Sequence, residues 1–150
     1  MTPELRVERT FEATAEEVFD AWTSPTVLKR WWAAGPDWDA PLVEVDLLVG
    51  GRYRLATRNP QNGEVHTVAG EYTEIQRPNR LSYSWAWENE PRSDHVSTVT
   101  VEFVAKDGQT TVVLTHSGLE NDESYGIHAY GWSEVLNNLE RRVFAARDRA

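Results

Sequence analysis

Apolar and polar positions alternate with a period of two along most of the chain. The alternation begins in residues 5–11, where Leu5, Val7 and Phe11 fall on one face of an expected strand. The same period returns in six later segments, at about residues 43–47, 53–55, 65–75, 81–87, 99–103 and 112–116. This pattern predicts a sheet of about six to seven strands with one buried face.

Short turn sequences separate the later segments. Gly50-Gly51, Asn62-Gly63 and Asp107-Gly108 tolerate the positive φ angles that tight turns require. Strands joined by short turns pair in the antiparallel sense, and a sheet with a single apolar face must cover that face with another element. We therefore expect an antiparallel sheet that packs against helices.

Three segments have the signals of helices. Thr14 and Glu17 match a capping box that begins a short helix, and Ser24 followed by Pro25 begins a second one. From about Asp122 onward, apolar positions follow a helical period. The stripe consists of Tyr125, His128, Trp132, Val135, Leu139 and Val143. We predict an α+β fold in one domain over residues 1–150, with a curved antiparallel sheet around a long C-terminal helix and two short helices after the first strand.

Composition narrows the classes of partner. The chain has 150 residues with 24 acidic and 15 basic side chains, so its net charge of −9 disfavours nucleic acids and anionic lipid surfaces. Cysteine is absent, which excludes disulfides and thiolate metal sites. The first residues lack the features of a signal peptide, and no apolar run approaches the roughly 20 residues that span a bilayer. We expect a cytoplasmic protein that does not enter the membrane.

Seven separated motifs are similar to those of one known family. They are FDAWTSP at residues 19–25, LKRWW at 28–32, DLLVGGRY at 46–53, GEYTEI at 70–75, RLSYSW at 80–85, LTHSG at 114–118 and HAYGW at 128–132. Together they resemble the activator of heat-shock-protein-90 ATPase homologue family of the START-like, or SRPBCC, superfamily. The resemblance extends over about residues 5–144. It implies a helix-grip fold whose cavity, between the sheet and the C-terminal helix, serves lipid carriers, cyclases and hormone-binding proteins.

Aromatic side chains supply the candidate cavity lining. The chain contains seven Trp, five Tyr and four Phe, and buried Trp and Tyr need partners for their polar atoms. This concentration favours a partly hydrated pocket over a dry core, although most single aromatic residues pack in cores. Strand parity and the helical stripe select Trp22, Trp32, Tyr53, Leu55, Tyr72, Tyr83, Trp85, Trp87, Val99, Val101, His116, His128 and Trp132 as ligand-binding candidates.

Candidate catalytic groups are few. His128 and His116 titrate near neutrality and share faces with aromatic and apolar residues, although each could instead be a neutral core histidine. His66 is expected at the rim and His95 at the surface. Glu71 and Glu74 are expected on opposite faces of one strand, so that a buried Glu71 could act as a base or either one could pair with an arginine.

The sequence leaves three functions open. The leading hypothesis is a protein that binds a small hydrophobic or aromatic molecule without a cofactor, since no metal-ligand spacing or nucleotide motif is present. The alternatives are a cofactor-independent enzyme of cyclase or hydrolase type and a chaperone-accessory interaction module. An exposed edge strand could also pair two copies into a homodimer.

Overall fold

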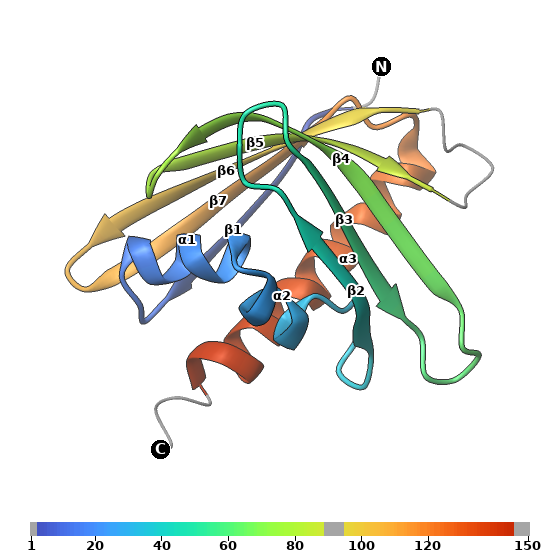
Figure 1. The fold of residues 1–150 in the computed structure, drawn as a ribbon, viewed down its shortest axis with the longest axis horizontal. Helices are drawn as coiled ribbons and strands as arrows, with labels where there is room; N and C mark the ends of the chain where they lie inside the picture. Colours follow the sequence, from blue (N-terminus) through green and yellow to red (C-terminus); the bar gives the residue numbers. More distant parts are fainter. Residues whose placement is uncertain (1–2, 89–94, 146–150) are drawn as a thin grey trace.

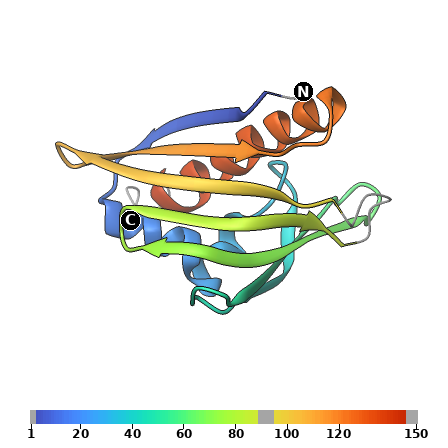
Figure 2. The ribbon, with the colours of Figure 1, turned by 90° about the horizontal axis from the view of Figure 1, so that it is seen from above.

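One curled antiparallel sheet forms the frame of the protein. The computed structural model describes residues 3–88 and 95–145, and within them seven strands pair in the order β1-β7-β6-β5-β4-β3-β2. Figure 2 shows β4 to β7 lying side by side, with α3 behind them. The strands are β1 (Leu5–Phe11), β2 (Asp39–Val45), β3 (Arg52–Arg58), β4 (Val65–Gln76), β5 (Arg80–Trp87), β6 (Ser97–Lys106) and β7 (Gln109–Ser117).

Two short helices, α1 (Ala15–Thr23) and α2 (Pro25–Trp31), follow the first strand as predicted. The Glu17 amide donates to Thr14 Oγ1 at 3.1 Å, and the Thr14 amide donates to the Glu17 carboxylate at 3.0 Å. This confirms the capping box at the start of α1. Ser24 ends α1 and precedes Pro25, so the chain turns at once into α2. Both helices lie on the concave side of the sheet (Figure 1).

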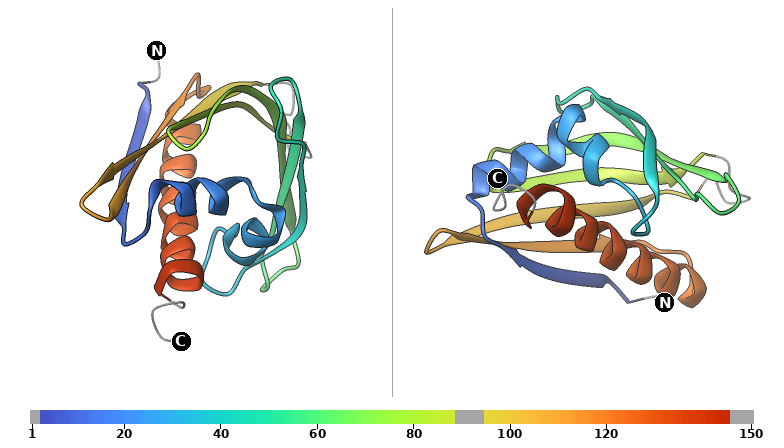
Figure 3. Two further views of the ribbon diagram at one scale, coloured as in Figure 1. Left: turned by 60° about the vertical axis from the view of Figure 1, so that its left-hand side comes forward. Right: turned by 90° about the horizontal axis from the view of Figure 1, so that it is seen from below.

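The long helix α3 (Asp122–Leu139) continues as a π-helical turn, η1 (Glu140–Phe144). Its start is capped by the Asn121 side chain, which accepts from the Ser124 amide at 2.9 Å. Trp132, Leu136 and Leu139 are buried, whereas the first two turns are exposed or half-buried. The backbone of α3 lies nearest β1 and α2, and the sheet curves around it (Figure 3). The predicted helix-grip architecture is therefore confirmed.

A bulge in β4 changes which side chains face inward. The register with β5 shifts between Tyr72 and Glu74, so Tyr72 and Ile75 both face inward. Glu71 and Glu74 consequently lie together on the outer face, where Glu74 accepts from Arg80 at 2.8 Å. The expectation that they lie on opposite faces was wrong, because strict alternation fails at a bulge.

None of the helices in the described ranges combines the length and the apolar character needed to cross a membrane.

Close approach of β4 to β5 requires a glycine at residue 70. A Cβ atom at this position would lie 2.0 Å from the Ser84 carbonyl oxygen, so the backbone of one strand would have to move. We expect Gly70→Ala to lower the free energy of unfolding by about 1–3 kcal/mol, as overpacking does in other proteins. Urea denaturation monitored by circular dichroism measures this change.

Gly126→Ala is the matched control, because nothing lies within 4 Å of a Cβ atom at that helical position. It should raise stability by up to about 1 kcal/mol through helix propensity. Equal stability of the Gly70→Ala variant and the wild type would contradict the close approach.

A candidate groove between α3 and the sheet

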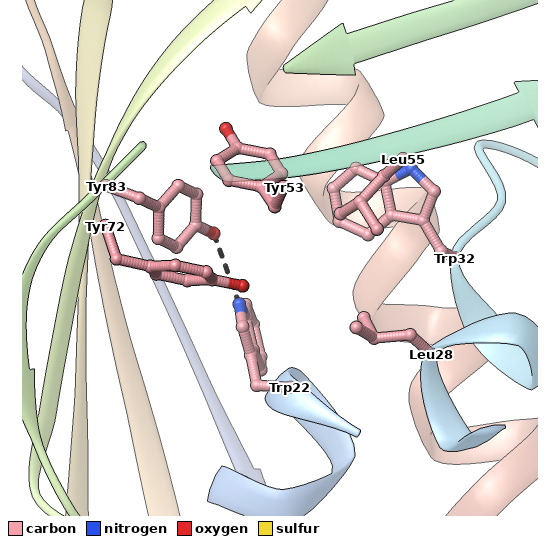
Figure 4. Close-up of a pocket in the computed structure, with 7 residues that line it drawn as sticks. All are labelled: Trp22, Leu28, Trp32, Tyr53, Leu55, Tyr72 and Tyr83. Carbon is pink, nitrogen blue, oxygen red and sulfur yellow. Dashed lines mark hydrogen bonds between the residues drawn. The ribbon is translucent and has the colours of Figure 1, made fainter. Parts of the chain in front are cut away.

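The interior beneath α1 and α2 is filled by aromatic side chains. Trp22 Nε1 donates to the Tyr83 hydroxyl at 3.2 Å (Figure 4). The Tyr53 hydroxyl donates to the Ser84 carbonyl at 2.6 Å. The rings leave a space of only about 10 Å³, roughly the smallest that holds one water molecule. This space is lined by Trp22, Leu28, Trp32, Tyr53, Leu55, Tyr72 and Tyr83.

Several predicted ligand contacts therefore belong to the packed core. Trp22, Tyr53, Leu55, Tyr72 and Tyr83 pack against one another and line no larger space among the described pockets. Polar atoms of these residues, such as Trp22 Nε1, find partners within the core, so the side chains enclose little free space. Val99 and Val101, also predicted as ligand contacts, are fully buried in the same core.

A much larger hollow lies beside the first half of α3. Its volume is about 750 Å³, which is within the range of small-molecule sites. We call it the α3 groove. Its walls come from α3, the loop of residues 32–38, and inward side chains of β3 to β6. The lining residues are Trp32, Ala34, Gly35, Pro36, Trp38, Thr57, His66, Trp85, Trp87, His95, Ser97, Leu119, Glu120, Glu123, Ser124, Ile127, His128, Tyr130, Gly131, Trp132 and Val135.

Of the predicted candidates, the structure brings Trp32, Trp85, Trp87, His128 and Trp132 together on this groove. Their rings are in mutual contact, with centroids of Trp85 and Trp132 5.0 Å apart. The edge-to-face and tilted geometries are those that aromatic pairs prefer. These five side chains form a continuous aromatic floor.

His128 accepts hydrogen bonds from two tryptophans of β5. The indole nitrogens of Trp85 and Trp87 donate to His128 Nε2 at 3.2 and 3.1 Å. His128 Nδ1 lies 2.7 Å from the Ser124 carbonyl oxygen. A carbonyl can only accept, so the proton of the neutral ring is on Nδ1 and the lone pair of Nε2 faces both indoles. Both imidazole nitrogens are thus engaged within the protein.

His116 forms a second, deeper junction. Trp132 Nε1 donates to His116 Nδ1 at 3.1 Å, so the ring proton is on Nε2, which contacts Ser97 Oγ at 2.8 Å. The side chain has no exposed surface and does not line the groove. Burial, together with nearby His128, lowers the pKa of His116 to about 3. Burial also lowers the pKa of His128.

The hydrogen bonds of His116 and His128 limit their use as general bases. A general base needs a lone pair directed at its substrate, but the lone pairs of His116 and His128 are directed at indole N–H groups. Glu71, the third candidate, is exposed on the outer face of β4 and does not line the groove. The geometry thus supports binding by apolar surfaces more than acid–base catalysis by these three residues.

The loop of residues 33–38 is fastened to the end of the long helix. Asn138 Nδ2 donates to the carbonyls of Ala33 and Gly35 at 2.8 and 2.9 Å. The Arg142 guanidinium donates to the carbonyls of Pro36 and Trp38 at 2.5 and 3.0 Å. Asn138 is fully buried, and it provides hydrogen bonds to backbone carbonyls of a loop that lies outside any helix or strand. This wall of the groove is therefore held in place by α3 and η1.

Sequence reasoning missed this wall and the mouth of the groove. Ile127 and Tyr130 lie on the lining although 61% and 66% of their surfaces are exposed. His95, expected at the surface, also lines the groove and contacts the Gly118 carbonyl at 2.8 Å. His66 lies at the groove as expected for a rim residue. The available signal was the presence of large apolar residues, Ile127 and Tyr130, on the polar side of the helical stripe.

Within the described residues, no group of three or more His, Cys, Asp or Glu side chains is placed to hold a metal ion.

The fold and the groove define the class of the protein: an α+β helix-grip protein with an aromatic groove beside its C-terminal helix. The family model described as activator of Hsp90 ATPase homolog 1-like protein matches residues 12–143, and the chain belongs to this family.

Three relatives illustrate the similarity. The mouse activator of 90 kDa heat shock protein ATPase homolog 1 is 22% identical over 122 residues, and the alignment covers 81% of this chain but 31% of that protein. The solution structure of an AHSA1-like protein from Aeromonas hydrophila is 29% identical with a TM-score of 0.79, covering 97% of this chain and 94% of the other. An HSP90 activator from Plasmodium falciparum is 28% identical with a TM-score of 0.69, covering 93% and 94%.

Neutral His116 makes stability depend on pH. Its pKa is about 3 when folded and near 6.5 when unfolded, so between these values the unfolded chain binds the extra proton. This contribution to stability is present above pH 6.5 and is lost as the pH falls toward 3. His116→Gln should be less stable at pH 7, and its deficit should shrink by about 1.4 kcal/mol per pH unit between pH 6 and pH 4.

Urea denaturation across this pH range measures the deficit. Val112→Ala, a buried apolar change on the same strand, is the control and should show a deficit that does not vary with pH. A constant deficit for His116→Gln would mean that His116 does not resist protonation.

Proposed function

We propose that the protein binds a small apolar molecule with aromatic character in the α3 groove. The observation that carries the proposal is a hollow of about 750 Å³ whose floor is built from four tryptophans and His128. Burial of a flat ligand against Trp87 would remove apolar surface from water, which favours binding by about 25 cal/mol per Å² before the costs of association are subtracted.

The construction of the groove supports the same function. Its floor is braced by hydrogen bonds from Trp85 and Trp87 to His128, and its wall is braced by Asn138 and Arg142. A site whose side chains are already held in place loses less conformational entropy when a ligand binds. The helix-grip fold of the family, in which the sheet curves around α3, provides the framework for such a site.

Gly131 offers a way to block the groove without disturbing the core. It lines the groove, and nothing lies within 4 Å of a Cβ atom built there. We expect wild-type protein to bind the neutral dye Nile red saturably, and Gly131→Phe to weaken binding by at least about tenfold, equivalent to 1.4 kcal/mol. Dye fluorescence titration measures both affinities.

Gly126→Phe is the matched control, because Gly126 is on the same helix, has the same open surroundings and does not line the groove. It should bind the dye like the wild type. Absence of saturable binding, or equal binding by the two Phe variants, would rule out the groove as the site.

A second candidate function is stimulation of a chaperone ATPase. It is favoured by the likeness to the Plasmodium falciparum HSP90 activator, which covers 93% of this chain at 28% identity. The loop between β2 and β3 provides an apolar surface for such a contact, since Leu48 and Val49 are 63% and 67% exposed. The chain spans about a third of the length of the mouse relative. The activity of that whole protein is therefore not assigned to this chain.

If this second function is correct, adding the protein to purified Hsp90 should raise the rate of ATP hydrolysis. Leu48→Ser with Val49→Ser should abolish the increase, because the contact surface becomes polar. Val104→Ser, which changes an exposed valine on β6, should leave the increase intact. A steady-state phosphate-release assay measures all three, and an unchanged rate with the wild-type protein would dismiss this function.

A further inference from the structure

We infer that the α3 groove selects amphipathic organic cations, meaning an aromatic body that carries a basic amine, over carboxylates of the same size. The inference rests on the proposed function and adds the charge of the ligand to it. Two observations support it: the charges of the side chains that line the groove, and the internal hydrogen bonds already made by donors on the groove floor.

The charged side chains of the lining are acidic. Glu120 and Glu123 line the groove, and the described lining contains no Lys or Arg. The whole chain carries a net charge of −9, so the surrounding field has the same sign. An anionic ligand would enter against this field, whereas a cation would be drawn toward it.

Three arginines of the adjoining elements are engaged elsewhere. Arg142 donates to the Pro36 and Trp38 carbonyls behind the wall loop, and Arg58 pairs with Asp39 at 2.5 Å. Arg54 pairs with Glu44 and Glu88 on the outer face. Recruiting one of these guanidinium groups to a ligand carboxylate would break an existing contact, which removes much of the gain.

Four of the five side chains of the floor already direct their N–H groups at acceptors within the protein. The indole N–H groups of Trp85 and Trp87 donate to His128, and that of Trp132 donates to His116. His128 Nδ1–H faces the Ser124 carbonyl, and His116 Nε2–H faces Ser97. A carboxylate on this floor would lose its hydration without gaining these donors.

The same aromatic rings line the groove, and the π faces of aromatic rings attract cations. Burial keeps His116 and His128 uncharged near neutral pH, so they add no positive charge to the floor. The other lining histidines are His66, which lies 3.6 Å from Glu64, and His95, which contacts the Gly118 carbonyl. An aromatic ligand stacked on the floor would therefore place an amine, and not an acid, toward Glu120 and Glu123.

A matched set of naphthalenes tests this inference. 2-Naphthylmethylamine, 2-naphthylmethanol and 2-naphthoate share one ring system and differ in charge. We expect the amine to displace Nile red at about tenfold lower concentration than the alcohol, and the naphthoate to be the weakest. The advantage of the amine should shrink as salt is added, since exposed charges are screened.

Glu120→Gln with Glu123→Gln should lower the affinity for the amine to that for the alcohol and leave the alcohol unchanged. Glu16→Gln with Asp107→Asn, which removes two exposed charges away from the groove, should retain the preference. Naphthoate binding as tightly as the amine, or an amine preference that survives the groove variant, overturns the inference.

The neutral compounds separate the two proposals. If the alcohol displaces Nile red and Gly131→Phe blocks it, while the amine has no advantage, the charge selection fails and the binding function stands. If Nile red itself does not bind, the binding function fails and the charge selection fails with it.

Discussion

Pairing of indole N–H groups with two neutral histidines is the constraint on which the rest of the structure depends. Trp85 and Trp87 on β5 donate to His128 on α3, and Trp132 on α3 donates to His116 on β7. Each buried indole would otherwise leave a donor without an acceptor, at a cost of about 1–3 kcal/mol. These bonds tie the helix to the sheet at two depths, and they fix the ring orientations of the groove floor.

The constraint explains why the molecule is packed at one end and hollow at the other. Beneath α1 and α2, tyrosine and tryptophan rings satisfy one another and leave about 10 Å³. Beside the first half of α3, the helix stands over the tryptophans of β5, and His128 links them instead of a bulky apolar side chain. The result is a groove of about 750 Å³ with a rigid floor, a wall held by Asn138 and Arg142, and an acidic lining.

The proposed binding function does not depend on acid–base chemistry by the two histidines. Both imidazole rings direct their lone pairs at indole N–H groups, so neither ring offers a base to the groove. Belonging to the Hsp90 ATPase activator homologue-like family establishes the fold and leaves the occupant of the groove to its own residues. We propose that the charge of Glu120 and Glu123, with no Lys or Arg on the described lining, favours a cationic occupant.

The sequence by itself determined the elements, because strand alternation, the Thr14 capping box and the stripe through Trp132 are local patterns that depend on neighbouring residues. It also selected the five residues of the groove floor, Trp85 and Trp87 by strand parity and the others from the patterns of the helices. Tertiary structure alone decided that Tyr53, Tyr72 and Tyr83 fill the core, that a bulge turns Glu74 outward, and that residues 34–38 form a wall. Periodicity reports which face a side chain takes, whereas the space between two layers depends on side-chain volumes and hydrogen-bond partners contributed by segments far apart in the chain.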